Sequence, residues 1–84
     1  MQTSYFNVID FMKTTDVYYK ISCLDKKFFS LREAKMHVYL SFTDGQLFLL
    51  EGESILKYVN GEPVTETPII VRNDGYCFCK TVRL

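Results

Sequence analysis

Residues 54–82 read SILKYVNGEPVTETPIIVRNDGYCFCKTV, in which Asn60-Gly61 and Asp74-Gly75 separate short runs of β-branched and aromatic residues. This pattern is typical of antiparallel hairpins, because a two-residue turn of the favoured type needs positive φ at both central positions. The stretch therefore predicts a C-terminal β-meander. A third dipeptide, Asp44-Gly45, marks either another hairpin turn or the end of a helix.

The Asn60-Gly61 turn also predicts which side chains of the first of these hairpins face the core. Successive side chains of a strand alternate between the two faces of a sheet. We expect the face with Leu56 and Tyr58 to contact the core, and the face with Ile55, Lys57 and Val59 to contact solvent. The predicted pairs are Val59 with Glu62, Tyr58 with Pro63, Lys57 with Val64, Leu56 with Thr65 and Ile55 with Glu66.

A two-residue turn at Asp74-Gly75 predicts the register of the second hairpin in the same way. Its core face is expected to contain Val71, Phe78 and Val82, and the opposite face is the less apolar of the two. The predicted pairs are Asn73 with Tyr76, Arg72 with Cys77, Val71 with Phe78, Ile70 with Cys79 and Ile69 with Lys80.

The sequence before the meander predicts one main helix. Ser30-Leu31-Arg32-Glu33 is a capping box, in which the serine oxygen accepts the Glu33 amide and the glutamate side chain accepts the serine amide. The helix should begin at about Leu31 and end between Leu40 and Phe42, before Asp44-Gly45. Its core stripe is predicted to contain Leu31, Ala34 and Val38, widened by Tyr39 and Phe42.

Two further elements are expected nearer the N-terminus. Residues 17–23 are rich in strand formers, and a polar turn at 24–27 leads into Phe28-Phe29, which predicts a first hairpin. Residues 5–13 admit a helix or a strand. Tyr5, Val8, Ile9 and Met12 recur at helical spacing and favour a short helix, whereas Phe6 and Phe11 lie off that stripe.

Together these patterns predict an α+β fold, with a mostly antiparallel sheet of four to six strands packed against one main helix. The length of 84 residues suits a single small domain over residues 1–84. Ten basic and ten acidic side chains give a formal net charge of zero, without the strong positive field typical of nucleic-acid or anionic-membrane binding.

Apolar runs and cysteines indicate the expected location. No run approaches the roughly 20 apolar residues of a membrane span, so we expect a soluble protein with no membrane partner. Residues 1–20 show no secretory signal pattern, because Asn7, Asp10 and Lys13 interrupt it. Three cysteines, an odd number, do not suggest a disulfide framework, and a cytoplasmic location is expected.

Candidate chemistry in the sequence is sparse. Cys77 and Cys79 are expected on one strand face, about 7 Å apart, where they could share a metal or redox partner, although two small half-buried residues are the simpler interpretation. His37 is the only histidine, and its place between Met36 and Val38 suits a structural helix residue. We therefore expect no catalytic activity, no metal site and no cofactor.

Nucleic-acid binding is the alternative function that the sequence offers. Aromatic and basic residues interleave over 18–29, as a base-stacking surface would require, and the contacts predicted there are Tyr19, Lys20, Lys26 and Lys27.

A strand pair followed by Phe28-x-Ser30-Leu31-x-Glu33-Ala34 resembles the sheet-then-helix ending of integrase-arm and AP2-type DNA-binding domains. In those domains the sheet enters the major groove, which would imply DNA contact by the first hairpin. The resemblance covers only residues 17–40, and the chain departs from that pattern by continuing into an acidic meander. It does not assign the chain to either family.

The expected function is a noncatalytic protein-interaction or assembly module. Surplus aromatic residues and a C-terminal strand could support strand addition by a protein partner, or self-association as a homodimer through a sheet edge. That expectation requires the strand around residues 76–82 to lie at an edge of the sheet, not at its centre.

Overall fold

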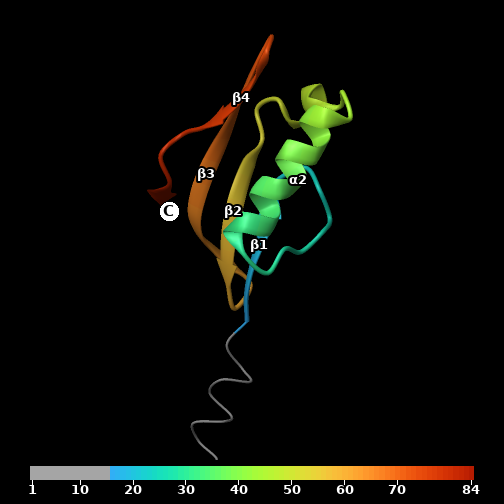
Figure 1. Cartoon of the computed structure of the whole chain (residues 1–84). Coiled ribbons are helices and arrows are strands. Elements are labelled where there is room, and N and C mark those ends of the chain that lie inside the picture. The colour runs from blue at the N-terminus through green and yellow to red at the C-terminus, as the bar shows by residue number, and fades with distance from the viewer. Residues whose placement is uncertain (1–15) are drawn as a thin grey trace, which may run out of the picture.

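The computed structural model describes residues 16–84, so the element predicted over residues 5–13 lies outside the described residues. One helix packs against a curled antiparallel sheet, which confirms the predicted α+β class. Figure 1 shows α2 lying across one face of that sheet. The elements are β1 (Val17–Ile21), α2 (Leu31–Thr43), the 3-10 helix η1 (Leu47–Leu50), β2 (Ser54–Val59), β3 (Glu62–Arg72), β4 (Gly75–Phe78) and β5 (Val82–Arg83).

The sheet has the order β1-β2-β3-β4, and every neighbouring pair is antiparallel. β5 pairs with residues 65–66 of β3, which pair on their other side with β2. β4 and β5 therefore lie along the same side of β3, interrupted by residues 79–81. The consecutive strands β2, β3 and β4 form the predicted C-terminal meander, and the last strands lie at the edge of the sheet.

The start of α2 follows the predicted capping box with one difference. The Ser30 Oγ accepts the Glu33 N–H at 3.1 Å, as expected for an N-cap serine. The Glu33 carboxylate accepts the N–H of Phe29 at 2.7 Å, one residue before the predicted partner. Two amides at the helix start are therefore bonded to side chains, and the helix begins at Leu31 as predicted.

The end of α2 resolves the ambiguity of Asp44-Gly45. Gly45 has φ of +73°, its N–H bonds to the carbonyl of Phe42 at 3.2 Å, and the N–H of Gln46 bonds to the carbonyl of Ser41 at 2.8 Å. These two bonds define a Schellman motif, which needs a residue with positive φ directly after the cap. The dipeptide ends the helix and forms no hairpin turn.

The predicted first hairpin is reduced to a single bridge. β1 ends at Ile21, because the Leu24 N–H bonds back to the Ile21 carbonyl at 2.8 Å and closes a turn. Tyr19 and Phe28 then exchange backbone hydrogen bonds of 2.7 and 2.8 Å. The returning chain does not continue as a strand, since α2 begins three residues after Phe28.

The β2–β3 hairpin has the predicted turn but a different register. Asn60 and Gly61 have φ of 51° and 86°, as the predicted turn requires, and Val59 lies opposite Glu62. The register shifts between Lys57 and Tyr58, where a bulge in β3 leaves Val64 without a direct partner on β2. The remaining pairs are Lys57 with Thr65, Leu56 with Glu66, Ile55 with Thr67 and Ser54 with Pro68, so the pairs predicted beyond Tyr58 are wrong.

The predicted faces of β2 are also wrong. Ile55 is 1% exposed and lies in the core beside its partners Ile21 and Thr67, whereas Leu56 is half-buried on the opposite face. The helix crosses the open end of the hairpin, and the turn end extends beyond it (Figure 1). Ile55 is at the covered end, so it contacts the core although Lys57 shares its face.

The β3–β4 hairpin turns at Asn73 and Asp74, one residue earlier than predicted. Arg72 pairs with Gly75, Val71 with Tyr76, Ile70 with Cys77 and Ile69 with Phe78. Gly75 lacks a positive φ and belongs to β4, so it does not supply the expected turn geometry. Each cross-strand partner differs by two residues from the predicted one, so every side chain keeps its predicted face of the sheet. Val71 and Phe78 pack against the core as predicted, whereas Val82 is 48% exposed.

The core lies between α2 and the sheet. Tyr39 and Phe42, which were predicted to widen the helix stripe, are exposed. Tyr39 lies about 100° around the helix from the fully buried Val38, and this rotation turns it away from the sheet. Phe42 packs edge-on against Tyr76 with centroids 5.7 Å apart and keeps one side open. The buried core is Ile21, Phe28, Ala34, Val38, Leu47, Leu50, Ile55 and Ile69.

The face assignment of β2 predicts unequal effects of two neighbouring substitutions. Ile55→Ala should lower the free energy of unfolding by about 2–5 kcal/mol, because it leaves a cavity under α2. Leu56→Ala should cost clearly less, since that side chain is half-buried on the uncovered face. Urea denaturation of both variants measures the difference.

A milder substitution keeps this comparison measurable if Ile55→Ala fails to fold. Ile55→Val should cost about 0.5–1.5 kcal/mol. A larger loss for Leu56→Ala than for Ile55→Ala would contradict the assigned faces.

Candidate interaction surface

The four residues predicted to contact nucleic acid lie on different sides of the molecule. Tyr19 packs against the core from the helix side of the sheet. Lys20 belongs to the opposite face, because neighbouring residues of a strand alternate, and its Nζ lies 3.8 Å from the carboxylate of Asp25. The two side chains therefore cannot form one contact surface.

Lys26 and Lys27 both line the hollow between the Phe28 loop and α2, but their ammonium groups contact different rings. The Lys27 Nζ lies 4.4 Å from the ring centroid of Tyr18, which stacks on Tyr58 with centroids 5.1 Å apart. The Lys26 Nζ lies 5.3 Å from the ring centroid of Phe28, on the side where Phe28 meets α2. Only Lys20 and Lys27 remain near one aromatic pair, Tyr18 and Tyr58.

The cysteines are free thiols, and the predicted partners of the C-terminal pair are wrong. Cys77 is half-buried opposite Ile70, while Cys79 is exposed just after β4. Over residues 16–84, no three or more His, Cys, Asp or Glu side chains gather closely enough to hold a metal ion. Neither helix in that part of the chain is long and apolar enough to cross a membrane.

His37 lies on the side of α2 next to the Phe28 loop. Its ring is tilted against the ring of Phe28 with centroids 5.5 Å apart. Partial burial, together with the positive charge of Lys26, lowers the pKa of His37 below its ordinary value of 6.5. The folded state therefore favours the neutral imidazole.

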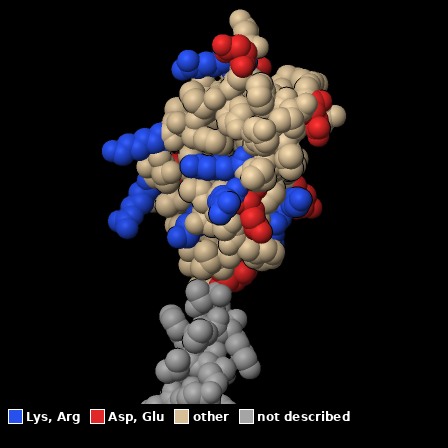
Figure 2. All heavy atoms as spheres, viewed as in Figure 1, with Lys and Arg blue, Asp and Glu red and all other residues tan. Residues whose placement is uncertain are grey.

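The outward side of α2 is apolar, which was not predicted from the sequence. Met36, Tyr39 and Leu40 are 48, 49 and 51% exposed. Their spacing of three and four residues places them together on the side of the helix away from the buried Ala34 and Val38. The signal was present in the sequence, since residues 36–43 contain no Lys, Arg, Asp or Glu. Figure 2 shows a largely uncharged area over this half of the helix.

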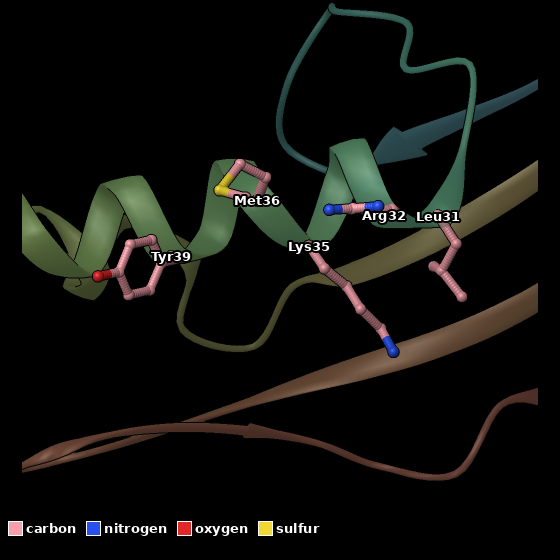
Figure 3. A pocket seen from close by; sticks show the side chains of 5 residues that line it. All are labelled: Leu31, Arg32, Lys35, Met36 and Tyr39. Carbon is pink, nitrogen blue, oxygen red and sulfur yellow. The ribbon is translucent and has the colours of Figure 1, made fainter.

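A shallow hollow adjoins this apolar side of α2. Leu31, Met36 and Tyr39 form its apolar lining, and Arg32 and Lys35 contribute the two cations. In Figure 3, Leu31 and Lys35 extend from the helix toward the strands of the sheet. Lys35 reaches β4, where its Nζ lies 5.0 Å from the ring centroid of Phe78. The hollow therefore lies on the flank of α2 that faces the β4 edge.

The two edges of the sheet differ in their availability. The β1 edge is covered at its centre, where Phe28 takes both backbone bonds of Tyr19. β4 pairs with β3 on one side, and no described strand pairs with its other side. We call the free β4 edge together with the flank of α2 (Leu31, Arg32, Lys35, Met36 and Tyr39) the α2–β4 surface.

Comparisons of the whole chain with protein-family models, curated proteins and solved structures find no match. A functional assignment therefore has to come from the geometry and chemistry of the surface.

The environment of His37 predicts a pH dependence of stability. As the pH falls through 6.5, the unfolded chain takes up a proton on His37 before the folded chain does. The free energy of unfolding should therefore decrease between about pH 7.5 and pH 5.5, and His37→Gln should remove this contribution. Urea denaturation across that pH range, with wild type and variant compared at each pH, measures it; parallel profiles would contradict it.

Proposed function

We propose that this chain is a noncatalytic protein-interaction module that binds its partner through the α2–β4 surface. The observation that carries the proposal is the pairing of a half-exposed apolar helix side with a free strand edge. A contiguous exposed apolar patch is unfavourable in water, and such patches commonly mark interaction sites.

The residue types on this surface suit a protein partner. Met, Tyr and Arg are enriched in protein interfaces, and Met36, Tyr39 and Arg32 lie side by side on α2. Apolar burial contributes roughly 25 cal/mol for each Å² removed from water, so covering the half-exposed Met36 and Tyr39 side chains provides binding free energy. Methionine also adapts its shape to the partner surface.

The noncatalytic character is part of the same proposal. His37, the only histidine, packs against the ring of Phe28, and its pKa is lowered by partial burial first and by the ammonium of Lys26 second. A general base works best with a carboxylate or a nucleophile as its neighbour. The three free cysteines support a reducing cytoplasm as the location of the module.

A single charge placed on the α2–β4 surface should abolish partner binding. Met36→Glu should weaken binding by about 2 kcal/mol or more, because it replaces an apolar contact with a carboxylate that must lose its hydration in the interface. A quantitative pull-down from extract of the source organism identifies the candidate partner, and calorimetry with that purified partner measures the loss.

The matched control for this experiment is Leu49→Glu. Leu49 is 58% exposed on η1, and the hollow that it lines contains no residue of the α2–β4 surface, so the same change in chemistry should leave binding unaltered. Far-UV circular dichroism checks that both variants remain folded. Equal binding by Met36→Glu and wild type would contradict the proposal.

Nucleic-acid binding is a second candidate, favoured by the stacked Tyr18 and Tyr58 rings with Lys20 and Lys27 nearby. Binding at that site would require the Lys27 ammonium to leave the Tyr18 ring and the Asp25 carboxylate to release Lys20. The overall charge of zero provides no compensating attraction to phosphate.

The first proposal therefore predicts that the protein passes through a single-stranded DNA or RNA column at about 50 mM salt, where phosphate contacts are strongest. Retention that falls with rising salt, and that Lys27→Ala reduces, would favour the second candidate. The column elution profile is the measurement, and Lys57→Ala serves as the charge-matched control.

A further inference from the structure

We infer that the α2–β4 surface binds an extended, acidic peptide segment, which adds to β4 as a further strand and places every second side chain, both apolar and acidic ones, against α2. This inference rests on the proposed function and names the chemistry of its partner. It follows from three features of the surface: the direction of the free backbone groups, the aromatic and apolar side chains beside them, and the sign of the nearby charge.

The backbone of β4 offers hydrogen-bonding groups to a new strand. The Cys79 N–H bonds to the Pro68 carbonyl of β3 at 2.9 Å. Because alternate residues of an antiparallel strand bond to opposite sides, Cys77 also bonds toward β3, while the N–H and C=O groups of Tyr76 and Phe78 point away from it. Among the described strands none takes these groups, so they are available to a partner.

The side chains of the same two residues continue the apolar surface toward α2. The rings of Tyr76 and Phe78 pack edge to face with centroids 5.6 Å apart, and both lie on the helix side of the sheet. A strand beside β4 would direct every second side chain toward that side. Those side chains would meet the two rings and the hollow lined by Leu31 and Tyr39.

The charges around the surface select an acidic partner. Arg32 and Lys35 lie on the flank of α2, and the only ion pair in the described part of the chain joins Lys20 to Asp25. The nearest carboxylate on the helix, that of Glu33, instead accepts the Phe29 amide. Glutamate or aspartate at a helix-facing position of the added segment would pair with these cations, which gives attraction and selectivity.

The same charges disfavour a second copy of this chain at this edge. Two copies joined through β4 would bring the cations of both surfaces together, and like charges across an interface are unfavourable. The edge is also short, since residues 79–81 interrupt it and β4 has four residues. Short, interrupted edges with a lysine such as Lys80 limit open-ended strand pairing and suit a short segment.

The test uses a blocked peptide of about nine residues, added to the full chain. Every second residue, meant to face α2, is in turn valine or phenylalanine and glutamate, and the residues between them are threonine. Amide hydrogen exchange of Tyr76 and Phe78 should slow about tenfold at a peptide concentration near ten times Kd. The Cys77 amide, which bonds toward β3, is the internal reference and should change little. Affinity should fall as salt rises.

Two control peptides and two variants test backbone pairing and charge separately. A peptide with lysine in place of glutamate, and one with N-methylated backbone amides, should each bind at least about tenfold more weakly. Arg32→Glu should weaken binding of the acidic peptide and strengthen binding of the lysine peptide. Lys57→Glu makes the same charge change on the central strand β2 and should leave both affinities unaltered.

Each outcome decides the inference. Two results together support it. The acidic peptide protects the Tyr76 and Phe78 amides from exchange, and Arg32→Glu reverses the preference for the acidic over the lysine peptide. Absence of binding, equal binding of the lysine peptide, or a dimer of the chain that protects these two amides overturns it. If the acidic peptide fails but Met36→Glu still abolishes capture of the native partner, the proposed function stands and only the partner chemistry is wrong.

Discussion

The register of β3 against its neighbours sets the positions of the core side chains and of the helix. This strand alone contacts β2, β4 and β5, and its bulge at Val64 shifts the pairing with β2 by one residue. A shift of one residue exchanges the faces of a strand. Here it places Thr67 beside Ile55 and orients Ile69 into the core, so α2 packs against an apolar surface of the sheet. The fold of the helix layer follows from that register.

The helix α2 contributes to both stability and the proposed binding surface. Ala34 and Val38 hold it against the sheet, while Met36 and Leu40 leave an apolar surface on the opposite side. A helix that is apolar on both sides is usually covered on both sides. Because the same helix forms the core contacts, the exposed side is held rigidly beside the β4 edge, which lowers the entropic cost of binding.

Features that depend on a few neighbouring residues were predictable. Ser30 and Glu33 fixed the start of α2, Gly45 its end, and Asn60-Gly61 the hairpin turn, because each acts through bonds within one turn of chain. The faces of β2 were not predictable, since they depend on a bulge and on where the helix crosses the hairpin. Of the predicted contacts, Tyr19 and Lys20 lie on opposite faces of the sheet, and the ammonium groups of Lys26 and Lys27 contact different rings. The exposure of Met36 and Leu40 was not predicted.

The α+β class, the ends of the main helix and the order of the meander strands follow from short stretches of sequence, because capping and turn chemistry are local. Which sheet edge stays free depends instead on how distant segments pack. Phe28 covers β1 by returning to Tyr19, whereas β4 has a neighbour on one side only. That edge lies beside the apolar side of α2 because Lys35 packs against Phe78, more than 40 positions away in the sequence. No local sequence pattern encodes such a contact.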